Sequence, residues 1–515
     1  MSSAAGKLPE PSIALHGAAL VAAVFVLSIA TFMAVLDINI VNVALPYIAG
    51  GLAVSPDEAT WTITSYAVAE AIVVPLTGWL TNRFGTVRVF IIGVLGFGIA
   101  SILCGVATTF PMLLLFRVMQ GMMGAPLIPA SQTLVLRISP PEKQNMTMGL
   151  WSMSTIAGPV AGPFLGGLLS DTAGWRWVFY INIPLVLICA ALAWRTMRDR
   201  ETPTTRDPVD FVGLGLLIIW VGALQVMLDK GQKLDWFESN FIVTAAVTAA
   251  IAFLAFIVWE LTDRNPIVDL RIFRNRTFTV AVAALFVCFC GFGGIAIIIP
   301  LWLQTNMGYT ATAAGEIIAM TAVLGVIAAP VTAILVSKVD VRAVICFGML
   351  VMSGASLYRI GFNQDMTFWQ LVPAQLAIGL SLPFWFMTIM SLTVAAVKPE
   401  QVAGAAGLSN FIRTIATAVS VSIATTYWID DATRSRSTLV GELHGQAALL
   451  GAFETLGRTR QQALQSLDNL VESQSVMLST NHLCLAIGII LGVAACGIWL
   501  MPKPQGSVSI SPGGH

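Results

Sequence analysis

Two apolar runs contain residues that are ill suited to lipid: LFRVMQGMMGAP at residues 115–126 and GPVAGPFLGG at 158–167. The polar turn RISPPEKQN at 137–145 lies between them. The first run places Arg117 among apolar residues, and the second places Gly-Pro pairs four residues apart. A charge and helix-breaking prolines are costly inside a membrane, and neither is needed to cross one. The two runs therefore indicate membrane segments that do more than span.

The composition of the 515 residues is that of an integral membrane protein. Hydrophobic residues make up 57% of the chain and charged residues 10%, with a mean hydropathy of +0.82. Soluble domains carry about 25% charged residues, so this chain lacks the polar surface of a soluble fold. The net charge of zero argues against nucleic acid as a partner. The cysteines and histidines have neither disulfide nor metal-ligand spacing, and no phosphate-binding GxxxxGK[ST] motif occurs.

Fourteen apolar runs are long enough to cross a membrane as helices, each of which needs about 20 residues. They are 17–40, 61–81, 88–107, 111–136, 146–169, 177–195, 209–228, 240–260, 278–303, 311–336, 343–360, 367–396, 402–429 and 480–501. An even number of spans places both termini on one side. Most of the 27 Lys and Arg residues fall on that side, and cytoplasmic segments are the ones enriched in Lys and Arg. The sequence therefore predicts an all-α membrane protein with both termini in the cytoplasm.

An internal repeat divides the chain into two related halves. PLTGWLTNRFGTVRVFIIG at 75–93 aligns with PVTAILVSKVDVRAVICFG at 330–348, and PEKQNMTMGL at 141–150 aligns with PEQVAGAAGL at 399–408. Two parallel six-helix halves, with spans 7 and 8 inserted between them, are typical of the major facilitator fold. The predicted domains are an N-terminal half at 1–195, linkers with the inserted helices at 196–277, a C-terminal half at 278–501 and a disordered cytoplasmic tail at 502–515.

Charged residues inside the spans are the candidates for proton coupling. A charge in a membrane is expensive unless it faces a cavity or a partner. Arg117 in span 4 keeps its proton, so it would act by pairing with an acid and changing how readily that acid binds a proton. Asp37 in span 1 is the first candidate acid and Glu70 in span 2 the second. Each acid has the alternative role of a structural partner for a neighbouring helix.

A strip of glycines and prolines runs along span 5. Its residues are Gly158, Pro159, Gly162, Pro163, Gly166 and Gly167. Glycines four apart let another helix pack closely, and prolines remove backbone hydrogen bonds so that a helix bends. Close packing alone would need the glycines but not the prolines. The combination predicts a moving, gating interface.

The turn between spans 2 and 3 is a second candidate for gating. Its residues are Gly78, Asn82, Arg83, Gly85 and Arg88. The glycines permit close helix contact and a turn. Arg83 and Arg88 are expected to hold helix C-termini or acids of the other half. The alternative is that both arginines are ordinary cytoplasmic anchors.

Three further residues are candidates for substrate contact or gating. Gln120 lies one turn after Arg117, Arg413 lies in span 13, and Trp385 lies in the aromatic span 12. An apolar pocket lined by aromatic and methionine side chains suits varied hydrophobic ligands. Arg413 has the alternative role of an interhelical pair. In the repeat, Arg117 falls opposite Gln375, which assigns coupling to the N-terminal half and substrate contacts to the C-terminal half.

The segment 430–479 is about fifty residues long and lies on the side opposite the termini. ALLGAFETL at 448–456 and QALQSLDNLV at 462–471 have apolar residues at helical spacing. We expect one or two short amphipathic helices there. They form either a lid on the protein itself or a docking surface for a periplasmic partner.

Several of these motifs resemble those of the fourteen-helix drug:proton antiporters of the major facilitator superfamily, and in particular the EmrB-type exporters of Gram-negative bacteria. LDINIVNVALP at 36–46 looks like the span-1 motif, and 115–126 is similar to the span-4 motif, which the family links to proton coupling through its arginine. GPVAGPFLGG looks like the span-5 antiporter motif, and WELTDRNPIVDLRIF at 259–273 resembles the EmrB group. GWLTNRFGTVR at 78–88 is similar to the loop motif, but Asn82 stands where the family has an aspartate.

The resemblance implies an inner-membrane pump that uses the proton as its coupling ion and needs no other cofactor. It also implies a periplasmic adaptor of the EmrA type (a membrane fusion protein) and an outer-membrane channel of the TolC type. We therefore expect proton-driven efflux of hydrophobic drugs and toxic compounds by alternating access. One alternative is a proton-coupled importer or facilitator, which would need more polar spans. Another is a membrane sensor or polytopic enzyme, although the loops contain no catalytic cluster.

Overall fold

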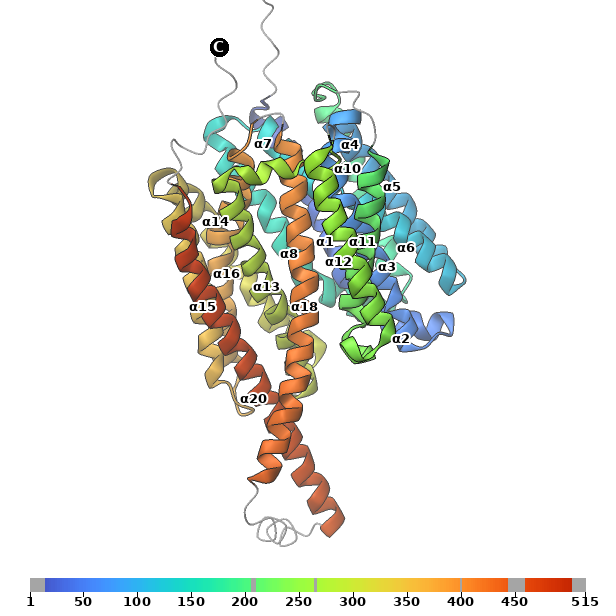
Figure 1. The fold of residues 1–515 in the computed structure, drawn as a ribbon, viewed down its shortest axis with the longest axis vertical. Coiled ribbons are helices and arrows are strands. Elements are labelled where there is room, and N and C mark those ends of the chain that lie inside the picture. Colours follow the sequence, from blue (N-terminus) through green and yellow to red (C-terminus); the bar gives the residue numbers. More distant parts are fainter. Residues whose placement is uncertain (1–13, 205–209, 264–265, 399–400, 443–458, 503–515) are drawn as a thin grey trace, which may run out of the picture.

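The structure is a computed structural model that describes residues 14–204, 210–263, 266–398, 401–442 and 459–502. Within these ranges the chain is helical and contains no β-strand. The helices form one bundle (Figure 1). Many large apolar side chains are exposed on it, as expected for helices surrounded by lipid. The described chain is thus the all-α membrane protein that the sequence predicts.

Ten helices and their short continuations build the N-terminal group of spans. Their bounds are α1 Gly17–Leu52, α2 Pro56–Ala59, α3 Trp61–Val73, α4 Thr77–Phe84, α5 Thr86–Val106, α6 Phe110–Gly124, α7 Leu127–Ile138, α8 Gln144–Thr172, α9 Trp177–Tyr180 and α10 Asn182–Met197. The 3-10 turn Val74–Leu76 joins α3 to α4 within one span. Pro75 removes a backbone donor there, which explains the break in α-helical geometry.

The second group of spans lies on the other side of the view in Figure 1. Its bounds are α13 Arg276–Thr305, α14 Ala311–Lys338, α15 Val341–Tyr358, α16 Phe368–Leu382, α17 Thr388–Ala395, α18 Val402–Gly441 and α20 Arg460–Gly497. A π-helical segment, Pro383–Met387, joins α16 to α17. Such segments are short interruptions of α-helices and frequently occur at functional sites.

The first of the two inserted helices touches both groups. The inserted helices are α11 Phe211–Lys230 and α12 Asn240–Thr262, which pack against each other. Thr64 in α3 donates a hydrogen bond to Asp229 at 2.6 Å, and Ser422 in α18 donates to the Leu228 carbonyl at 2.7 Å. The end of α11 therefore bridges the two groups of spans.

Thirteen segments of the described residues are long and apolar enough to cross a membrane. Each coincides with one of the fourteen predicted runs. The remaining run, 146–169, falls on α8, a continuous helix of 29 residues. Its side chains are only partly described, and that of Pro163 lies outside the described part.

Both ends of the described chain lie at one end of the bundle. The Leu15 N–H donates to the Ile138 carbonyl at 2.7 Å, and Arg342 Nη1 donates to the Met501 carbonyl at 3.1 Å. The arginine-containing turn 82–88 lies at this same end (Figure 1). We call it the basic end. The first and last described residues thus share one side, as an even number of spans predicts.

The opposite end carries a long helical hairpin, formed where α18 and α20 continue beyond the other helices (Figure 1). We call it the α18/α20 hairpin. Arg436 joins its two arms through Asp468 at 2.5 Å and Glu472 at 3.2 Å. The expectation of separate short helices in 430–479 is wrong for the described part, because QALQSLDNLV belongs to α20. The polar residues mark where the helices leave the membrane and not where they end. ALLGAFETL lies outside the described residues.

The two groups of spans meet closely at the basic end. A Cβ atom added to Gly78 in α4 would lie 2.7 Å from the Gly404 Cα atom in α18. Gln132 in α7 donates to the Met390 carbonyl at 3.2 Å and accepts a hydrogen bond from Asn410 in α18 at 2.9 Å. Gln132, Met390 and Asn410 are buried. The structure is therefore a conformation in which the halves are closed against each other at the basic end.

Candidate coupling site

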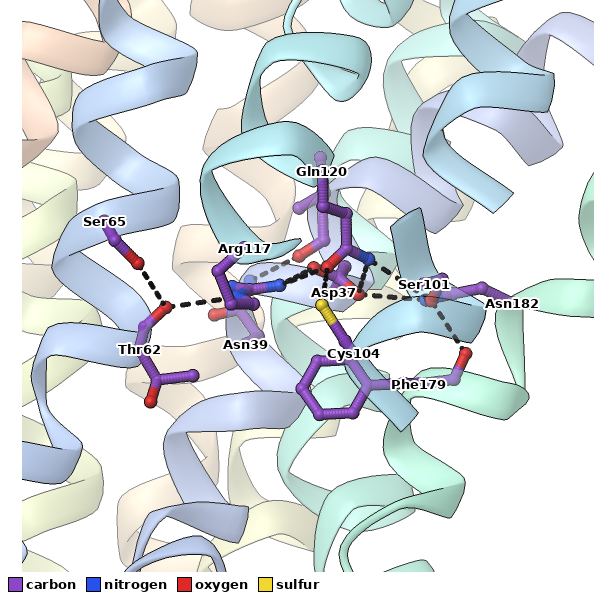
Figure 2. A network of polar contacts seen from close by, with 11 residues as sticks. Asp37, Asn39, Thr62, Ser65, Ser101, Cys104, Arg117, Gln120, Phe179 and Asn182 are labelled. Carbon is purple, nitrogen blue, oxygen red and sulfur yellow. Dashed lines mark hydrogen bonds and ion pairs between the residues drawn. The ribbon is translucent and has the colours of Figure 1, made fainter. Parts of the chain in front are cut away.

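A buried ion pair between α1 and α6 forms the centre of the candidate site (Figure 2). Arg117 Nη1 lies 2.5 Å from Asp37 Oδ2, and both side chains are 0% exposed. Neither residue is near a helix end, so the charges compensate each other and not a helix dipole. The structure confirms the prediction that Asp37 is the partner of Arg117.

Two amide side chains complete the environment of the Asp37 carboxylate. Gln120 Nε2 and Asn182 Nδ2 each donate to Asp37 Oδ1 at 2.9 Å. Gln120 lies one turn after Arg117 in α6, and Asn182 is the first residue of α10. Hydrogen bonds to an ionised carboxylate are stronger than those between neutral groups. Three donors from two helices therefore surround the Asp37 carboxylate.

Ser101 in α5 connects this carboxylate environment to a fourth helix (Figure 2). Its hydroxyl lies 3.3 Å from Gln120 Nε2 and 3.1 Å from Asn182 Nδ2, and it donates to the Phe179 carbonyl at 2.8 Å. Ser101 and Asn182 are both fully buried. The network thus joins α1, α5, α6 and α10 around one charge.

Arg117 makes further contacts on the side facing α3. Its Nε donates to the Thr62 carbonyl at 3.0 Å, and its Nη1 donates to Gln120 Oε1 at 2.8 Å. The guanidinium lies over the Tyr66 ring, 4.3 Å from its centroid. Nη2 has no hydrogen-bond acceptor among the described residues. Arg117 is therefore held by α3 as well as by Asp37, and its Nη2 donor has no partner among the described residues.

Glu70 lies outside this network. It is 5% exposed in α3 and makes neither a hydrogen bond nor an ion pair with its carboxylate among the residues that the structure describes. Its electrostatic interactions are with Arg413 first, then with Arg117 and Asp37. Glu70 is thus a buried acid without a direct partner among the described residues.

The glycines of α8 pack against the turn of α1 that carries Asp37. A Cβ atom added to Gly158 would lie 2.6 Å from Val35, and one added to Gly162 would lie 2.5 Å from the Asn39 Cβ atom. At Gly166 it would lie 2.7 Å from the Ile40 carbonyl oxygen. Real side-chain carbons do not approach so closely, so only glycine permits this helix contact.

Two other residues of the strip make no such contact with α1. A Cβ atom added to Gly167 would meet Val43 at an ordinary 4.0 Å. Pro159 is half-buried, and α8 remains helical through positions 159 and 163. The strip thus has a contact row of three glycines, while α8 is not broken at its prolines.

Arg413 and Trp385 lie together in the second half. The Arg413 guanidinium is 5.8 Å from the centroid of Phe289, and the Trp385 ring contacts the same phenylalanine edge-on at 5.3 Å. Arg413 Nε and Trp385 Nε1 are buried without acceptors among the described residues. Trp385 lies in the π-helical segment between α16 and α17. Arg413, Trp385 and Phe289 therefore form a cluster in which the Arg413 Nε and Trp385 Nε1 donors have no acceptor among the described residues.

The turn after α4 is organised by Glu201. The backbone N–H groups of Val87 and Arg88 donate to its two carboxylate oxygens at 2.9 Å each, which caps α5. Gly85 has a φ of +93°, a conformation that side chains other than glycine rarely adopt. The Arg88 side chain is 72% exposed and lies 3.9 Å from Glu201. The expectation that Arg88 holds an acid of the other half is therefore wrong here, since its acid follows α10.

Asn82 and Arg83 lie in the last turn of α4. Asn82 is exposed and Arg83 is half-buried. Gly78, one turn earlier, is the residue of this motif that meets the second half, at Gly404. In this conformation a glycine of the motif thus makes a close contact between the halves.

Comparison with known proteins identifies the family. The profile of the Major Facilitator Superfamily matches residues 27–421. The chain belongs to the Major Facilitator Superfamily. It is 39% identical over 507 residues to the multidrug export protein EmrB of Escherichia coli K12, covering 97% of this chain and 99% of that protein. It is 38% identical over 507 residues to the fatty acid resistance protein FarB of Neisseria gonorrhoeae, with the same coverage.

A third relative and two solved structures agree with this assignment. EmrB of Haemophilus influenzae is 36% identical over 514 residues, covering 98% of this chain and all of that protein. The human organic anion transporter MFSD10 matches with a TM-score of 0.56 at 12% identity, covering 92% and 99% of the two chains. The peptide transporter POT matches with a TM-score of 0.57 at 16% identity, covering 93% and 95%. The chain is thus an EmrB-type member of a transporter superfamily and not an enzyme.

Three residues of this major facilitator protein's network were missed by reasoning from the sequence. Ser101, Asn182 and Thr62 contribute to the Asp37–Arg117 environment. The available signal was that Asn182 and Ser101 are isolated polar residues within apolar segments. Thr62 gave no signal, because it contributes only its backbone carbonyl.

Proposed function

We propose that this protein is a proton-driven exporter of hydrophobic compounds that works by alternating access in the inner membrane. The observation that carries the proposal is the buried Asp37–Arg117 pair, which lies on the turn of α1 that faces the glycines of α8. Because the Asp37 charge and the close contact between α1 and α8 lie on the same turn of α1, a change in the charge of Asp37 would act directly on the position of α1 against α8. The relatives named for multidrug export and fatty acid resistance support hydrophobic substrates.

Proton binding at Asp37 is the proposed trigger. A proton on the carboxylate removes its charge and leaves Arg117 buried without a counter-ion, which is strongly unfavourable. The helices that hold Asp37 and Arg117 then rearrange to a conformation in which the arginine finds other acceptors. Asp37 lies in α1 and Arg117 in α6, so the rearrangement moves α1 relative to α6 and α8.

The orientation supplies the direction of transport. The basic end lies in the cytoplasm by the distribution of Lys and Arg. Each proton that enters from outside releases about 2.3 kcal/mol per 100 mV of membrane potential, in addition to the pH term. The conformation described here, closed at the basic end, is then the one that exchanges protons and substrate with the outside. Arg413, Trp385 and Phe289 are the proposed substrate contacts in the second half.

The function is tested with purified protein in proteoliposomes under an imposed pH gradient. We expect a hydrophobic fluorescent dye to move against the direction of proton flow, and movement to stop when an ionophore collapses the gradient. Dye movement that ignores the gradient would exclude proton-coupled antiport. Movement in the same direction as the protons would instead show a proton-coupled importer.

The closed basic end gives a prediction about the conformational equilibrium. Gln132→Ala or Asn410→Ala removes a buried hydrogen bond between the halves, at a cost of about 1–3 kcal/mol. This is expected to shift the equilibrium about 5- to 150-fold towards the conformation open at the basic end. Distances between spin labels across the basic end measure the shift. Ser337→Ala is the control, because the exposed Ser337 hydroxyl bonds only to its own helix. An unchanged distance distribution in both variants would show that the bond is not part of the gate.

The α18/α20 hairpin is the proposed docking surface for the periplasmic adaptor, through which an outer-membrane channel would connect. Leu464 and Leu470 on its α20 arm are 42% and 47% exposed. Leu464→Asp with Leu470→Asp is expected to weaken capture of the adaptor about fivefold or more, since apolar anchors contribute over about 1 kcal/mol each. Transport in proteoliposomes is expected to remain normal.

The measurement compares drug resistance of cells with transport by the purified variant. Gln465→Asp adds a similar charge at an exposed polar position of the same arm and serves as the control. Loss of both resistance and liposome transport would show that the hairpin stabilises the transporter itself. Full resistance in the double variant would exclude this surface as the adaptor site.

A further inference from the structure

A groove at the basic end lies apart from the Asp37 network. It occupies about 650 Å³ between α1, α8 and α14, which is within the roughly 300–1,000 Å³ typical of small-molecule sites. Phe25, Met146 and Val326 line it and are 57%, 59% and 51% exposed. These exposed apolar side chains lie on membrane-spanning helices, so the groove opens sideways towards lipid. None of the motifs that resemble those of the antiporter family supplies a residue to this groove.

One charged side chain lies at the rim of this groove. Lys143 is the only charged residue among those that line it. The Lys143 side chain makes no ion pair or hydrogen bond with any residue that the structure describes. It immediately precedes α8, so the positive end of that helix dipole lies beside its ammonium group. The groove is therefore apolar along its length and positive at one end.

This distribution of charge selects one class of ligand. Lys143 immediately precedes α8 at the basic end, where the distribution of Lys and Arg places the cytoplasmic surface of the membrane. A single acyl chain would lie along Phe25, Met153 and Val326, with a negatively charged head at Lys143. A cationic head group would be repelled at the same place. Met146 and Met153 adapt readily to chains of different shape.

We propose that this groove is the entry site for anionic single-chain amphiphiles from the membrane leaflet at the basic end. The inference rests on the proposed export function and names a substrate class for it. An occupant of the groove would contact α1 and α8, the two helices whose contact carries the Asp37 turn. Substrate arrival is thereby placed next to the interface that is proposed to move.

Photo-labelling tests the groove without a proton gradient. The protein is placed in phosphatidylcholine nanodiscs and titrated with a hexadecanoic acid that carries a diazirine in its chain. We expect labelled peptides from α1, α8 and α14 at the groove. Val326→Trp fills the groove and is expected to remove this labelling. Val331→Trp, on the same helix at a residue that is 47% exposed but outside the groove, is expected to leave it unchanged.

The role of the charge is tested with Lys143 variants. Lys143→Gln is expected to raise the concentration for half-maximal labelling about fivefold, since one basic residue near the membrane surface contributes about 1 kcal/mol. Lys143→Arg should restore the wild-type value. Lys338→Gln, which removes an exposed charge at the same end but outside the groove, should have no effect.

Three outcomes would overturn the proposal. Equal labelling by the uncharged hexadecanol analogue would exclude selection by Lys143. Displacement of the fatty acid by a few mole per cent of phosphatidylglycerol would show a site for bulk phospholipid. Normal gradient-driven dye transport in a protein whose groove is never labelled would exclude this entry route. Conversely, intact groove labelling without any gradient-driven transport would contradict the export function and not the groove.

Discussion

Asp37→Asn is expected to abolish gradient-driven transport while leaving substrate binding measurable. Asparagine has nearly the size of aspartate and imitates its protonated, uncharged state. The variant leaves Arg117 buried with no counter-ion among its described contacts, and loss of one partner of such a pair costs roughly 3–5 kcal/mol. The protein should therefore shift to its proton-loaded conformation, and substrate binding should no longer depend on pH. Proton release on substrate addition, measured with a pH dye in detergent, checks the result.

Two matched variants separate coupling from a general loss of charge. Asp171→Asn removes the acid that accepts a hydrogen bond from Tyr47 at an exposed position, and transport should remain normal. Glu70→Gln removes the other candidate acid, which has no direct partner among the described residues, and its effect should be smaller than that of Asp37→Asn. Retained gradient-driven transport in Asp37→Asn, with loss in Glu70→Gln, would move the proton site to Glu70.

A double variant shows how much of the defect comes from the unpaired arginine. Asp37→Asn with Arg117→Gln removes both charges from the buried site. Replacing a buried ion pair by uncharged groups is often neutral for stability, so thermal stability should recover relative to Asp37→Asn. Transport should stay absent, because no carboxylate remains in the network. The thermal midpoint in detergent and the pH-gradient assay measure the two effects separately.

The spans and the Asp37–Arg117 pair could be predicted from the sequence because both follow from the cost of polarity in lipid. A backbone in lipid must satisfy its own hydrogen bonds, so long apolar runs become helices. Two opposite charges in different spans are each too costly alone, so each requires a partner. Asp37 is therefore the first candidate partner for Arg117, although the sequence does not show which helices approach each other.

The remaining contacts of the site could not be predicted, because they depend on helix placement. Asn182 bonds to Asp37 across a separation of 145 residues, and a lone asparagine at the start of a helix carries no pattern. Arg359 is a second example, since it lies at the end of the predicted run 343–360, where a charged side chain is expected to reach the surface. In the structure it is 1% exposed, and its three guanidinium nitrogens have no acceptors among the described residues.

Helix ends were predicted least well for a related reason. The run 17–40 was expected to end where polarity begins, but α1 continues through Pro46 to Leu52. The same error shortened the helices of the α18/α20 hairpin. Hydropathy reports where a helix leaves the membrane, while its end depends on caps and on packing with neighbours. The partner of Arg88 was misjudged because Glu201 lies in a linker whose path the sequence does not show.

Gly162→Ala is expected to produce the second large loss of transport, although it adds a single carbon. The new Cβ atom would lie 2.5 Å from the Asn39 Cβ atom and 3.1 Å from the Asn39 backbone carbonyl carbon. Both belong to the α1 turn next to Asp37, so α1 or α8 must move to accept the methyl group. Overpacking of this kind typically costs 1–3 kcal/mol. Because the displaced turn carries the proton site, the proton-coupled rate should fall at least about tenfold, more than the loss of stability would suggest.

Gly167→Ala is the matched control for this effect. It lies in the same strip of the same helix and adds the same carbon, but that carbon would meet Val43 at an ordinary 4.0 Å. Transport and thermal stability of this variant should both resemble the wild type. If Gly162→Ala is destabilised but couples protons normally, the glycine row serves only packing. If the two alanine variants transport equally well, contact between α8 and the Asp37 turn is not the link between proton binding and movement.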